Sequence, residues 1–172
     1  MLNLRERYQW FADTARTLTR TQILQVAEVT AKIPNASHVY MAKIDGIALG
    51  MLDGWPSHHF YERWLQVPRL RRGQWKSFDV ALYHDGTLCG LCFATAKRSK
   101  RRIKLMLLEG SPDPGHPLKG FVAAFMILAV ENYAKMIDIP QILIPDPVPG
   151  AVPHYLKLGF VYDSNGQLVK GV

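Results

Sequence analysis

The stretch Pro-His-Tyr-Leu-Lys-Leu-Gly-Phe-Val at residues 153–161 joins the end of a helix to the start of a strand. The apolar pattern predicts a helix over 151–158, and Gly159 follows it where a left-handed C-cap is expected, because glycine adopts a positive φ without steric cost. A final strand is expected over 160–162. The stretch therefore predicts a helix–turn–strand unit that carries Tyr155 on its helix.

Before this unit, three apolar runs predict an antiparallel meander. Phe78–Tyr83 and Leu88–Ala96 have the length and composition of strands, and Asp85-Gly86 between them is one of the strongest short hairpin signals. A third run, Ile103–Leu108, follows a basic turn. The meander predicts three neighbouring strands in one sheet.

The segment between the meander and the last unit predicts one long helix and one short strand. A loop rich in glycine and proline over 110–117 precedes an apolar helix from about Leu118 to Met136, and Ile142–Ile144 has the pattern of a buried strand. This order of elements predicts an α+β fold with a mixed, mostly antiparallel sheet flanked by helices.

The first 75 residues predict additional helices. Apolar spacing indicates helices over 4–18 and 21–33, the second capped by Thr21, and a short helix over 58–66 that ends at Pro68. Residues 39–52 fit either a strand entering an Asp45-Gly46 turn or one buried helix, and we favour the strand.

Length and composition predict a single domain over 1–172, with a helical part over 1–75 and a core over 77–163. A chain of 172 residues with 48% hydrophobic content can form one sizeable core. No apolar run approaches the roughly 18 to 20 residues that cross a bilayer, and the first residues do not resemble a secretory signal. We expect a cytoplasmic protein that does not contact membranes.

Cys89 and Cys92 are the only cysteines, and their spacing suggests a redox or metal site at first sight. They fall in a predicted strand, where residues three apart point to opposite faces, and no second pair completes a zinc site. We interpret both as core residues and expect no metal.

The net charge of +7 includes basic clusters at 69–72 and 97–102. Such clusters favour a polyanionic partner, whether nucleic acid, an anionic membrane surface or a cofactor with phosphate groups. Solvated loops that keep the protein soluble explain them equally well. Both interpretations stay open at this point.

The loop that leads into the apolar helix is a candidate phosphate site. Unpaired N–H groups and the positive end of the dipole meet at a helix N-terminus. Lys119 and Gly120 stand there. The alternative is an ordinary surface loop that caps a core helix.

The pattern Tyr155-x-x-Leu158-Gly159-Phe160, together with the meander, the loop, the long helix and the strand, resembles the GNAT superfamily of N-acetyltransferases over about residues 77–163. The resemblance implies a GNAT-like sheet and acetyl-coenzyme A as the acyl donor. It departs from the family in the pyrophosphate loop: in one alignment Phe121 replaces the first glycine of the usual pattern, and an alignment shifted by one residue restores Gly120 but needs a one-residue gap.

The resemblance also implies where the donor binds. Pantetheine would lie between the strand that holds Leu107 and Leu108 and the next parallel strand. The residues that would hold the pyrophosphate lie around the start of the long helix: Lys119, Gly120, Phe121, Val122 and Ala123.

The same resemblance implies direct attack by the acceptor amine on the thioester. A β-bulge near Leu107 would direct a backbone N–H at the thioester oxygen. Tyr155 would be the general acid that protonates the leaving thiolate. Glu109 is the first candidate for the base, ahead of His116 and His154, and water can carry the proton if none of them does.

The acceptor is expected to be a primary amine, on a small molecule, a peptide or lysine, or an aminoacyl-tRNA. The basic clusters favour RNA as a partner in the last case, and a homodimer stays open. The competing hypothesis is a non-catalytic GNAT-like module that binds nucleic acid or protein through its basic surface.

Overall fold

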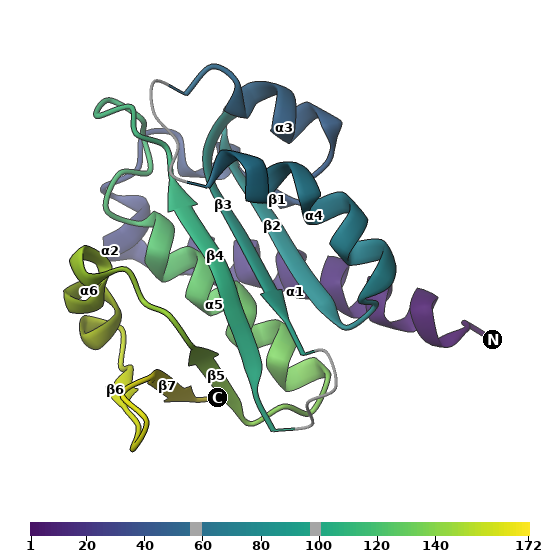
Figure 1. The fold of residues 1–172 in the computed structure, drawn as a ribbon. Helices are drawn as coiled ribbons and strands as arrows, with labels where there is room; N and C mark the ends of the chain where they lie inside the picture. Colours follow the sequence, from purple (N-terminus) through teal and green to yellow (C-terminus); the bar gives the residue numbers. More distant parts are fainter. Residues whose placement is uncertain (56–59, 97–100) are drawn as a thin grey trace.

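The computed structural model describes residues 1–55, 60–96 and 101–172. These residues form a seven-stranded sheet with the order β1-β2-β3-β4-β5-β7-β6 (Figure 1). Its strands are β1 (Val39–Ala42), β2 (Ser77–His84), β3 (Thr87–Thr95), β4 (Ile103–Gly110), β5 (Gln141–Ile144), β6 (Val161–Tyr162) and β7 (Leu168–Gly171). Among these strands, β4 and β5 pair in parallel and the other pairs are antiparallel. The predicted fold class is confirmed.

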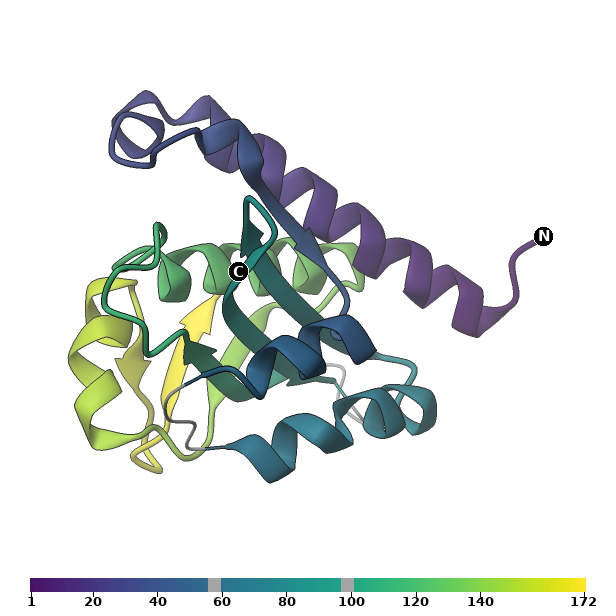
Figure 2. The same cartoon turned by 90° about the horizontal axis from the view of Figure 1, so that it is seen from above.

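Helices cover both faces of the sheet. They are α1 (Leu4–Gln25), α2 (Ala27–Thr30), α3 (Gly46–Leu52), α4 (Tyr61–Gly73), α5 (Val122–Met136) and α6 (Val152–Lys157), with short 3-10 turns at Ala36–His38 and Pro149–Ala151. Figure 2 shows α1 and α5 on one face and α3 and α4 on the other. The buried residues accordingly form two clusters, one on each face of the sheet.

The hairpin between β2 and β3 has the predicted turn. Asp85 and Gly86 have φ angles of +48° and +76°, as a two-residue turn that matches the twist of its strands requires. The meander of β2, β3 and β4 is confirmed at all three strands.

The predicted break before Thr21 is wrong, because α1 is continuous from Leu4 to Gln25. The Thr19 hydroxyl donates to the Ala15 carbonyl at 2.7 Å, and the Thr21 hydroxyl donates to the Thr17 carbonyl at 3.1 Å. Each threonine thus satisfies its hydroxyl within the helix instead of capping a new one.

The strand over 39–42 is confirmed, but the Asp45-Gly46 turn is not. The Asp45 carboxylate accepts from the N–H groups of Ile47 and Ala48, both at 3.0 Å, and is therefore the N-cap of α3. The chain enters a helix at the position where the favoured interpretation placed a turn.

Pro68 does not end α4, which continues to Gly73. Buried Trp64 and Val67 before the proline, and Leu70 after it, pack on the same hydrophobic cluster. This packing offsets the hydrogen bond that proline cannot donate. The predicted start of this helix at His58 lies outside the described residues.

The C-terminal region contains one strand more than predicted. β7 pairs with both β5 and β6, and the turn before it contains Gly166 with a φ of +74°.

The α5 helix begins later than predicted, at Val122, because residues 117–121 form turns. One of them passes through Gly120 with a φ of +86°.

Gly90 of β3 allows α5 to approach the sheet closely. A Cβ atom at this position would lie 2.5 Å from Val122 Cγ1 and 3.3 Å from Met126 Cε. We expect Gly90→Ala to lower the free energy of unfolding by about 1–3 kcal/mol, because α5 must shift to admit the methyl group. Urea denaturation followed by circular dichroism measures the loss.

Gly46→Ala is the matched control for this variant. Gly46 begins α3 and has open space around the position of a Cβ atom. Alanine there should leave the stability unchanged or raise it slightly. Equal stability of Gly90→Ala and the wild type would contradict the close approach of α5.

Candidate active site

β4 and β5 diverge soon after they begin to pair. Their parallel register joins only Ile103 to Ile142 and Lys104 to Leu143, and the two strands then separate (Figure 1). A cavity of about 130 Å³ lies in this opening. Its walls are β4 residues 105–108, the segment 144–148 that begins with the last residue of β5, Tyr155 of α6, and Phe60 and Arg63 at the start of α4.

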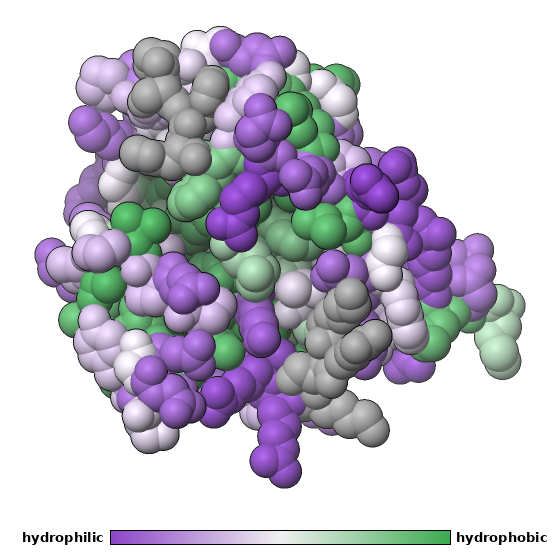
Figure 3. All heavy atoms as spheres, viewed as in Figure 1, coloured by the Kyte–Doolittle hydropathy of each residue, from purple (hydrophilic) through white to green (hydrophobic). Residues whose placement is uncertain are grey.

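The lining of the opening is mixed, with polar atoms beside apolar side chains. On the face drawn in Figure 3, hydrophobic residues (green) gather in the middle, with hydrophilic residues (purple) around them. Arg63 and Asp146 are the charged residues among those that line the cavity. A chain of methylene and amide groups is the kind of ligand that suits such a wall.

A β-bulge interrupts β4 beside the cavity. Phe93 of β3 pairs with Leu107 and Ala94 pairs with Leu105, which leaves Met106 as an extra residue without a partner in β3. Bulges turn local backbone groups away from the ladder. The bulge lies next to Leu107, close to where the GNAT resemblance implied one, and both Leu107 and Leu108 line the cavity.

Tyr155 reaches the cavity because α6 ends abruptly. Gly159 has a φ of +90°, the Phe160 N–H donates to the Tyr155 carbonyl at 3.1 Å, and the Gly159 N–H donates to the Leu156 carbonyl at 3.1 Å. These two bonds form a Schellman motif, so the predicted C-cap is confirmed. The turn places the Phe160 ring edge-on against the Tyr155 ring, with 5.6 Å between centroids.

The Tyr155 phenol is held in its protonated form. Its side chain is buried, and burial raises its pKa to about 12, with Cys92 adding to the shift. The phenol therefore keeps its proton throughout the neutral pH range, at the edge of the cavity.

Glu109 lies at the end of β4 and is bound to α4. Its carboxylate accepts from Trp64 Nε1 at 2.7 Å, across 45 positions of sequence. Trp64 is fully buried, so this bond fixes the carboxylate on the α4 side of the sheet. Glu109 is not among the described residues that line the cavity between β4 and β5.

The two histidines considered as bases lie elsewhere. His116 is buried in the loop before α5, where burial lowers the pKa of its imidazole. His154 is exposed on α6. Neither is among the described residues that line the cavity, so the structure brings only Tyr155, Leu107 and Leu108 of the predicted set together there.

The predicted pyrophosphate residues surround the N-terminus of α5. No side chain caps this helix, Lys119 is exposed, and a Cβ atom at Gly120 would meet nothing within 4 Å. Val122 is buried within 3.6 Å of the Cβ position of Gly110, which places the helix start beside the end of β4. Ala123 follows it in the first turn of the helix.

Phe121 packs on the helix that it precedes. Its ring stacks on Phe125 with 5.5 Å between centroids, and it is half-buried against the main hydrophobic cluster. The bulky side chain is thus part of the core, while Gly120 supplies the open backbone position in this loop.

The two basic clusters differ in what the structure shows of them. In the cluster at 69–72, Arg71 donates to the Asp79 carboxylate at 2.6 Å, whereas Arg69 and Arg72 are exposed. In the cluster at 97–102, residues 97–100 lie outside the described residues. Arg102 lies 3.7 Å from the Asp163 carboxylate.

No known family model matches the sequence, and no curated protein matches it either. Solved structures do match. The N-acetyltransferase PseH of Campylobacter jejuni shares the fold with a TM-score of 0.54 and 10% identity, over 78% of this chain and 97% of its own. The spermidine/spermine N-acetyltransferase SpeG of Vibrio cholerae has a TM-score of 0.56 and 16% identity, over 78% of this chain and 93% of its own.

The PaiA N-acetyltransferase of Thermoplasma acidophilum, solved in complex with coenzyme A, matches with a TM-score of 0.52 and 16% identity, over 76% of this chain and 96% of its own. This chain has the GNAT fold. The similarity extends well beyond the half of the chain, residues 77–163, on which the sequence resemblance rested. Because the GNAT neighbours are covered almost completely, about a fifth of this chain has no counterpart in them.

Among residues 1–55, 60–96 and 101–172, no helix is long and apolar enough to cross a bilayer. Within the same residues, no group of three or more histidine, cysteine or acidic side chains could hold a metal ion. Cys89 and Cys92 are free and buried.

Proposed function

We propose that this chain is an N-acetyltransferase that transfers the acetyl group of acetyl-coenzyme A to a primary amine by direct attack. The observation that carries the proposal is the meeting of three features at one cavity: the divergence of β4 from β5, the bulge at Met106, and the buried phenol of Tyr155. The GNAT fold and the coenzyme A complex of the PaiA neighbour support it.

The residues of this chain offer contacts for two parts of the donor, the pantetheine and the pyrophosphate. Leu107 and Leu108 offer apolar contacts and interrupted backbone for the pantetheine. The uncapped N-terminus of α5 offers N–H groups and a positive dipole to the pyrophosphate. Lys119 adds a charge there, and Gly120, Phe121, Val122 and Ala123 supply the backbone.

Tyr155 is the proposed general acid. When the amine attacks the thioester carbon, the C–S bond breaks and the sulfur leaves as a thiolate, which takes the phenolic proton. A backbone N–H at the bulge in β4 would stabilise the oxyanion that forms meanwhile. Glu109 remains the candidate base, acting through water, since its carboxylate is bound to Trp64 and lies outside the lining of the cavity.

The proposed acceptor is a primary amine, and the SpeG neighbour, named for spermidine and spermine, supports this class. Aminoacyl-tRNA stays within the proposal because exposed Arg69 and Arg72 give α4 a basic end. A cytoplasmic location and a homodimer also remain proposals. The alternative is a non-catalytic module that binds nucleic acid or protein, and it predicts that coenzyme A does not bind.

Coenzyme A is expected to raise the melting temperature of the protein. A ligand at 100 times its Kd stabilises the folded state by about 2.7 kcal/mol. Differential scanning fluorimetry with coenzyme A up to millimolar concentration measures the shift. The absence of any shift would contradict the enzymatic proposal and favour the non-catalytic module.

Lys119→Ala should weaken this binding about two- to fivefold, because it removes one charge from the pyrophosphate site. Lys135→Ala is the matched control. Lys135 is exposed in the last turn of the same helix, at the opposite end from the site, and its loss should leave the coenzyme A affinity unchanged.

A further inference from the structure

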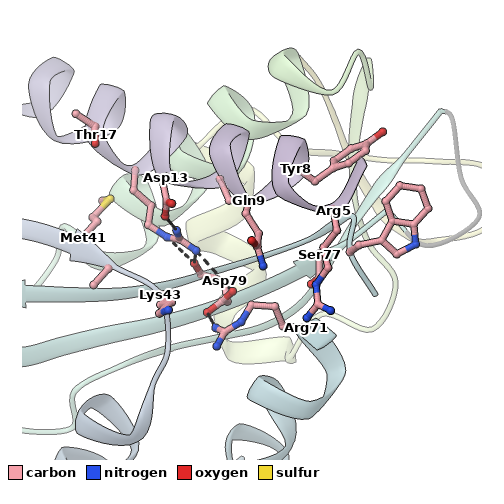
Figure 4. A pocket seen from close by; sticks show the side chains of 14 residues that line it. Arg5, Tyr8, Gln9, Asp13, Thr17, Met41, Lys43, Arg71, Ser77 and Asp79 are labelled. Atoms are coloured by element: carbon pink, nitrogen blue, oxygen red, sulfur yellow. Dashed lines mark hydrogen bonds and ion pairs between the residues drawn. The ribbon is translucent and has the colours of Figure 1, made fainter. Parts of the chain in front are cut away.

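A second cavity, of about 420 Å³, lies away from the β4–β5 opening, at the edge of the sheet that β1 forms. It forms where β1 ends. β1 pairs with β2 only through residues 81–84, so the first half of β2 extends beyond it. α1 and the end of α4 close the space from the two faces of the sheet, and Figure 4 shows the side chains that line it.

A buried ion network forms the floor of this cavity. The Asp79 carboxylate is 1% exposed and accepts from the Ile44 N–H and from Arg71 Nη1, both at 2.6 Å. Arg16 donates from Nε and Nη2 to the Asp79 carbonyl, at 2.9 and 2.7 Å, and from Nη1 to the Asp13 carboxylate at 2.7 Å. The positive charges of these two arginines and the negative charges of these two aspartates therefore cancel.

Two further cations leave the cavity with an excess of positive charge. Arg5 and Lys43 also line it, and their charged groups have no carboxylate partner in the part of the chain that the structure describes. Figure 4 shows the charged ends of Arg5, Lys43 and Arg71 along β2 in this view. The lining thus carries a net charge of about +2, which matches a dianion.

A buried hydroxyl lies in the same place. Ser77 is 6% exposed, and its Oγ has no hydrogen-bond partner among the described residues. Burying an unpaired hydroxyl is costly. The Oγ is closed off from the surface in this rotamer, and rotation of the short side chain toward the cavity that Ser77 lines would let a ligand oxygen satisfy it. Ser77 and Asp79 alternate with buried Phe78 along β2, so both polar side chains face the α4 side of the sheet.

Two aromatic residues form a wall beside the charges. The Tyr8 and Trp75 rings pack edge-to-face with 5.3 Å between centroids, and both line the cavity. Trp75 is 41% exposed. A cavity of this size is well within the range of small-molecule sites and holds more than an inorganic anion, so the wall has room for the organic part of a ligand.

We propose that this cavity, the α1–α4 pocket, binds a small organic phosphate monoester. Its phosphate group would be held by Arg5, Lys43 and Arg71 and would accept from the Ser77 hydroxyl. Its organic part would lie against Tyr8 and Trp75. A phosphate monoester carries about −1.5 to −2 charges at pH 7, which balances the excess of the lining. This site is separate from the β4–β5 cavity and does not depend on the proposed acetyltransferase activity.

Isothermal titration with phenyl phosphate tests the α1–α4 pocket, with phenol and inorganic phosphate as reference ligands. Phenyl phosphate should bind in a 1:1 ratio, phenol should not bind, and inorganic phosphate should bind at least about tenfold more weakly. The variant Arg5→Ala/Lys43→Ala should lower the affinity for phenyl phosphate at least about tenfold. Both residues are exposed, so this variant is expected to fold, which circular dichroism checks.

Arg69→Ala is the matched control, since Arg69 is an exposed cation of α4 outside the pocket lining. It should bind phenyl phosphate as the wild type does. No binding at millimolar phenyl phosphate, or equal binding by the Arg5→Ala/Lys43→Ala variant, would overturn the proposal. Binding of a single-stranded RNA oligonucleotide in place of phenyl phosphate would overturn it as well, in favour of a nucleic-acid surface.

The same variant separates this proposal from the acetyltransferase proposal. The coenzyme A melting shift of Arg5→Ala/Lys43→Ala should equal that of the wild type, because neither residue lies near the β4–β5 cavity or the start of α5. If coenzyme A does not bind, the expected binding of phenyl phosphate is unaffected. If phenyl phosphate does not bind, the expected melting shift with coenzyme A is likewise unaffected.

Discussion

Tyr155→Phe is expected to lower the turnover of acetyl transfer by roughly 100-fold, because a positioned general acid contributes about 10²- to 10⁴-fold. The variant removes one oxygen and keeps the ring, so the edge-to-face contact with Phe160 persists. Coenzyme A should therefore still raise its melting temperature as it does for the wild type. Steady-state kinetics with acetyl-coenzyme A and an amine panel, read as thiol release, measure the loss.

The pH profile gives this prediction a second readout. Burial raises the pKa of Tyr155 to about 12, so the phenol keeps its proton and the acid form is present at every pH up to about 11. The wild-type rate should consequently show no alkaline decline from this group between pH 7 and 10. A decline with a midpoint near the ordinary tyrosine pKa of about 10 would contradict the assignment.

Tyr162→Phe is the matched control for Tyr155→Phe. Tyr162 of β6 is 55% exposed and lies outside the described lining of the β4–β5 cavity. Its variant should keep wild-type turnover. Full activity of Tyr155→Phe would remove Tyr155 from the mechanism and leave solvent as the proton donor.

The parts of the fold that the sequence predicts correctly depend on short-range backbone chemistry. The Asp85-Gly86 hairpin and the Gly159 cap each require positive φ angles at residues that tolerate them, and both are found. The Asn165-Gly166 turn before β7 offered the same kind of signal. It was missed because the strands on either side are only two and four residues long.

The elements predicted wrongly have different causes, a local hydrogen bond in one case and tertiary packing in another. Thr21 has the chemistry of a cap, but its hydroxyl bonds back within α1. Pro68 is a helix breaker by itself, yet Trp64, Val67 and Leu70 hold α4 against the sheet on both sides of it. The bond of Thr21 to Thr17 is local, whereas the continuation of α4 past Pro68 cannot be derived from a window of a few residues, since it depends on packing against the sheet.

The residues of the candidate site that the GNAT resemblance covers could be predicted from the sequence. Those that depend on contacts between distant elements could not. Tyr155 and the bulge beside Leu107 follow from the resemblance. The bond between Trp64 and Glu109 spans 45 positions and joins two elements, so no motif contains it. The cluster at 69–72 was interpreted as a solvated or polyanion-binding patch, but Arg71 within it binds a buried aspartate contributed by β2.

Asp79→Ala is expected to lower the free energy of unfolding by about 3–5 kcal/mol, because it removes one partner of a buried ion pair. The carboxylate accepts from the Ile44 N–H and from Arg71, and its Oδ1 lies 3.6 Å from Arg16 Nη2. Without it, the buried Ile44 N–H loses its acceptor. Arg16 keeps the main-chain carbonyl of residue 79, the exposed Asp13 carboxylate and the ring of Phe78, 5.4 Å from its guanidinium carbon, as partners.

The size of this effect rests on the inability of Arg16 to give up its charge. Arg16 is 6% exposed, and burial lowers its pKa while Asp79 and Asp13 oppose the shift. A guanidinium nevertheless stays protonated under all folding conditions. It cannot become neutral when its partner is removed, as a buried lysine or carboxyl can, so the charge left without compensation destabilises the folded state directly.

Asp13→Ala is the matched control, and urea denaturation measures both variants. Asp13 binds the same guanidinium at 2.7 Å, but its side chain is 75% exposed, so its loss should cost no more than about 1 kcal/mol. Asp79→Asn should fall between the two, since the amide oxygen can still accept from Ile44 while the charge is gone. Equal stability of Asp79→Ala and Asp13→Ala would show that burial does not set the strength of this network.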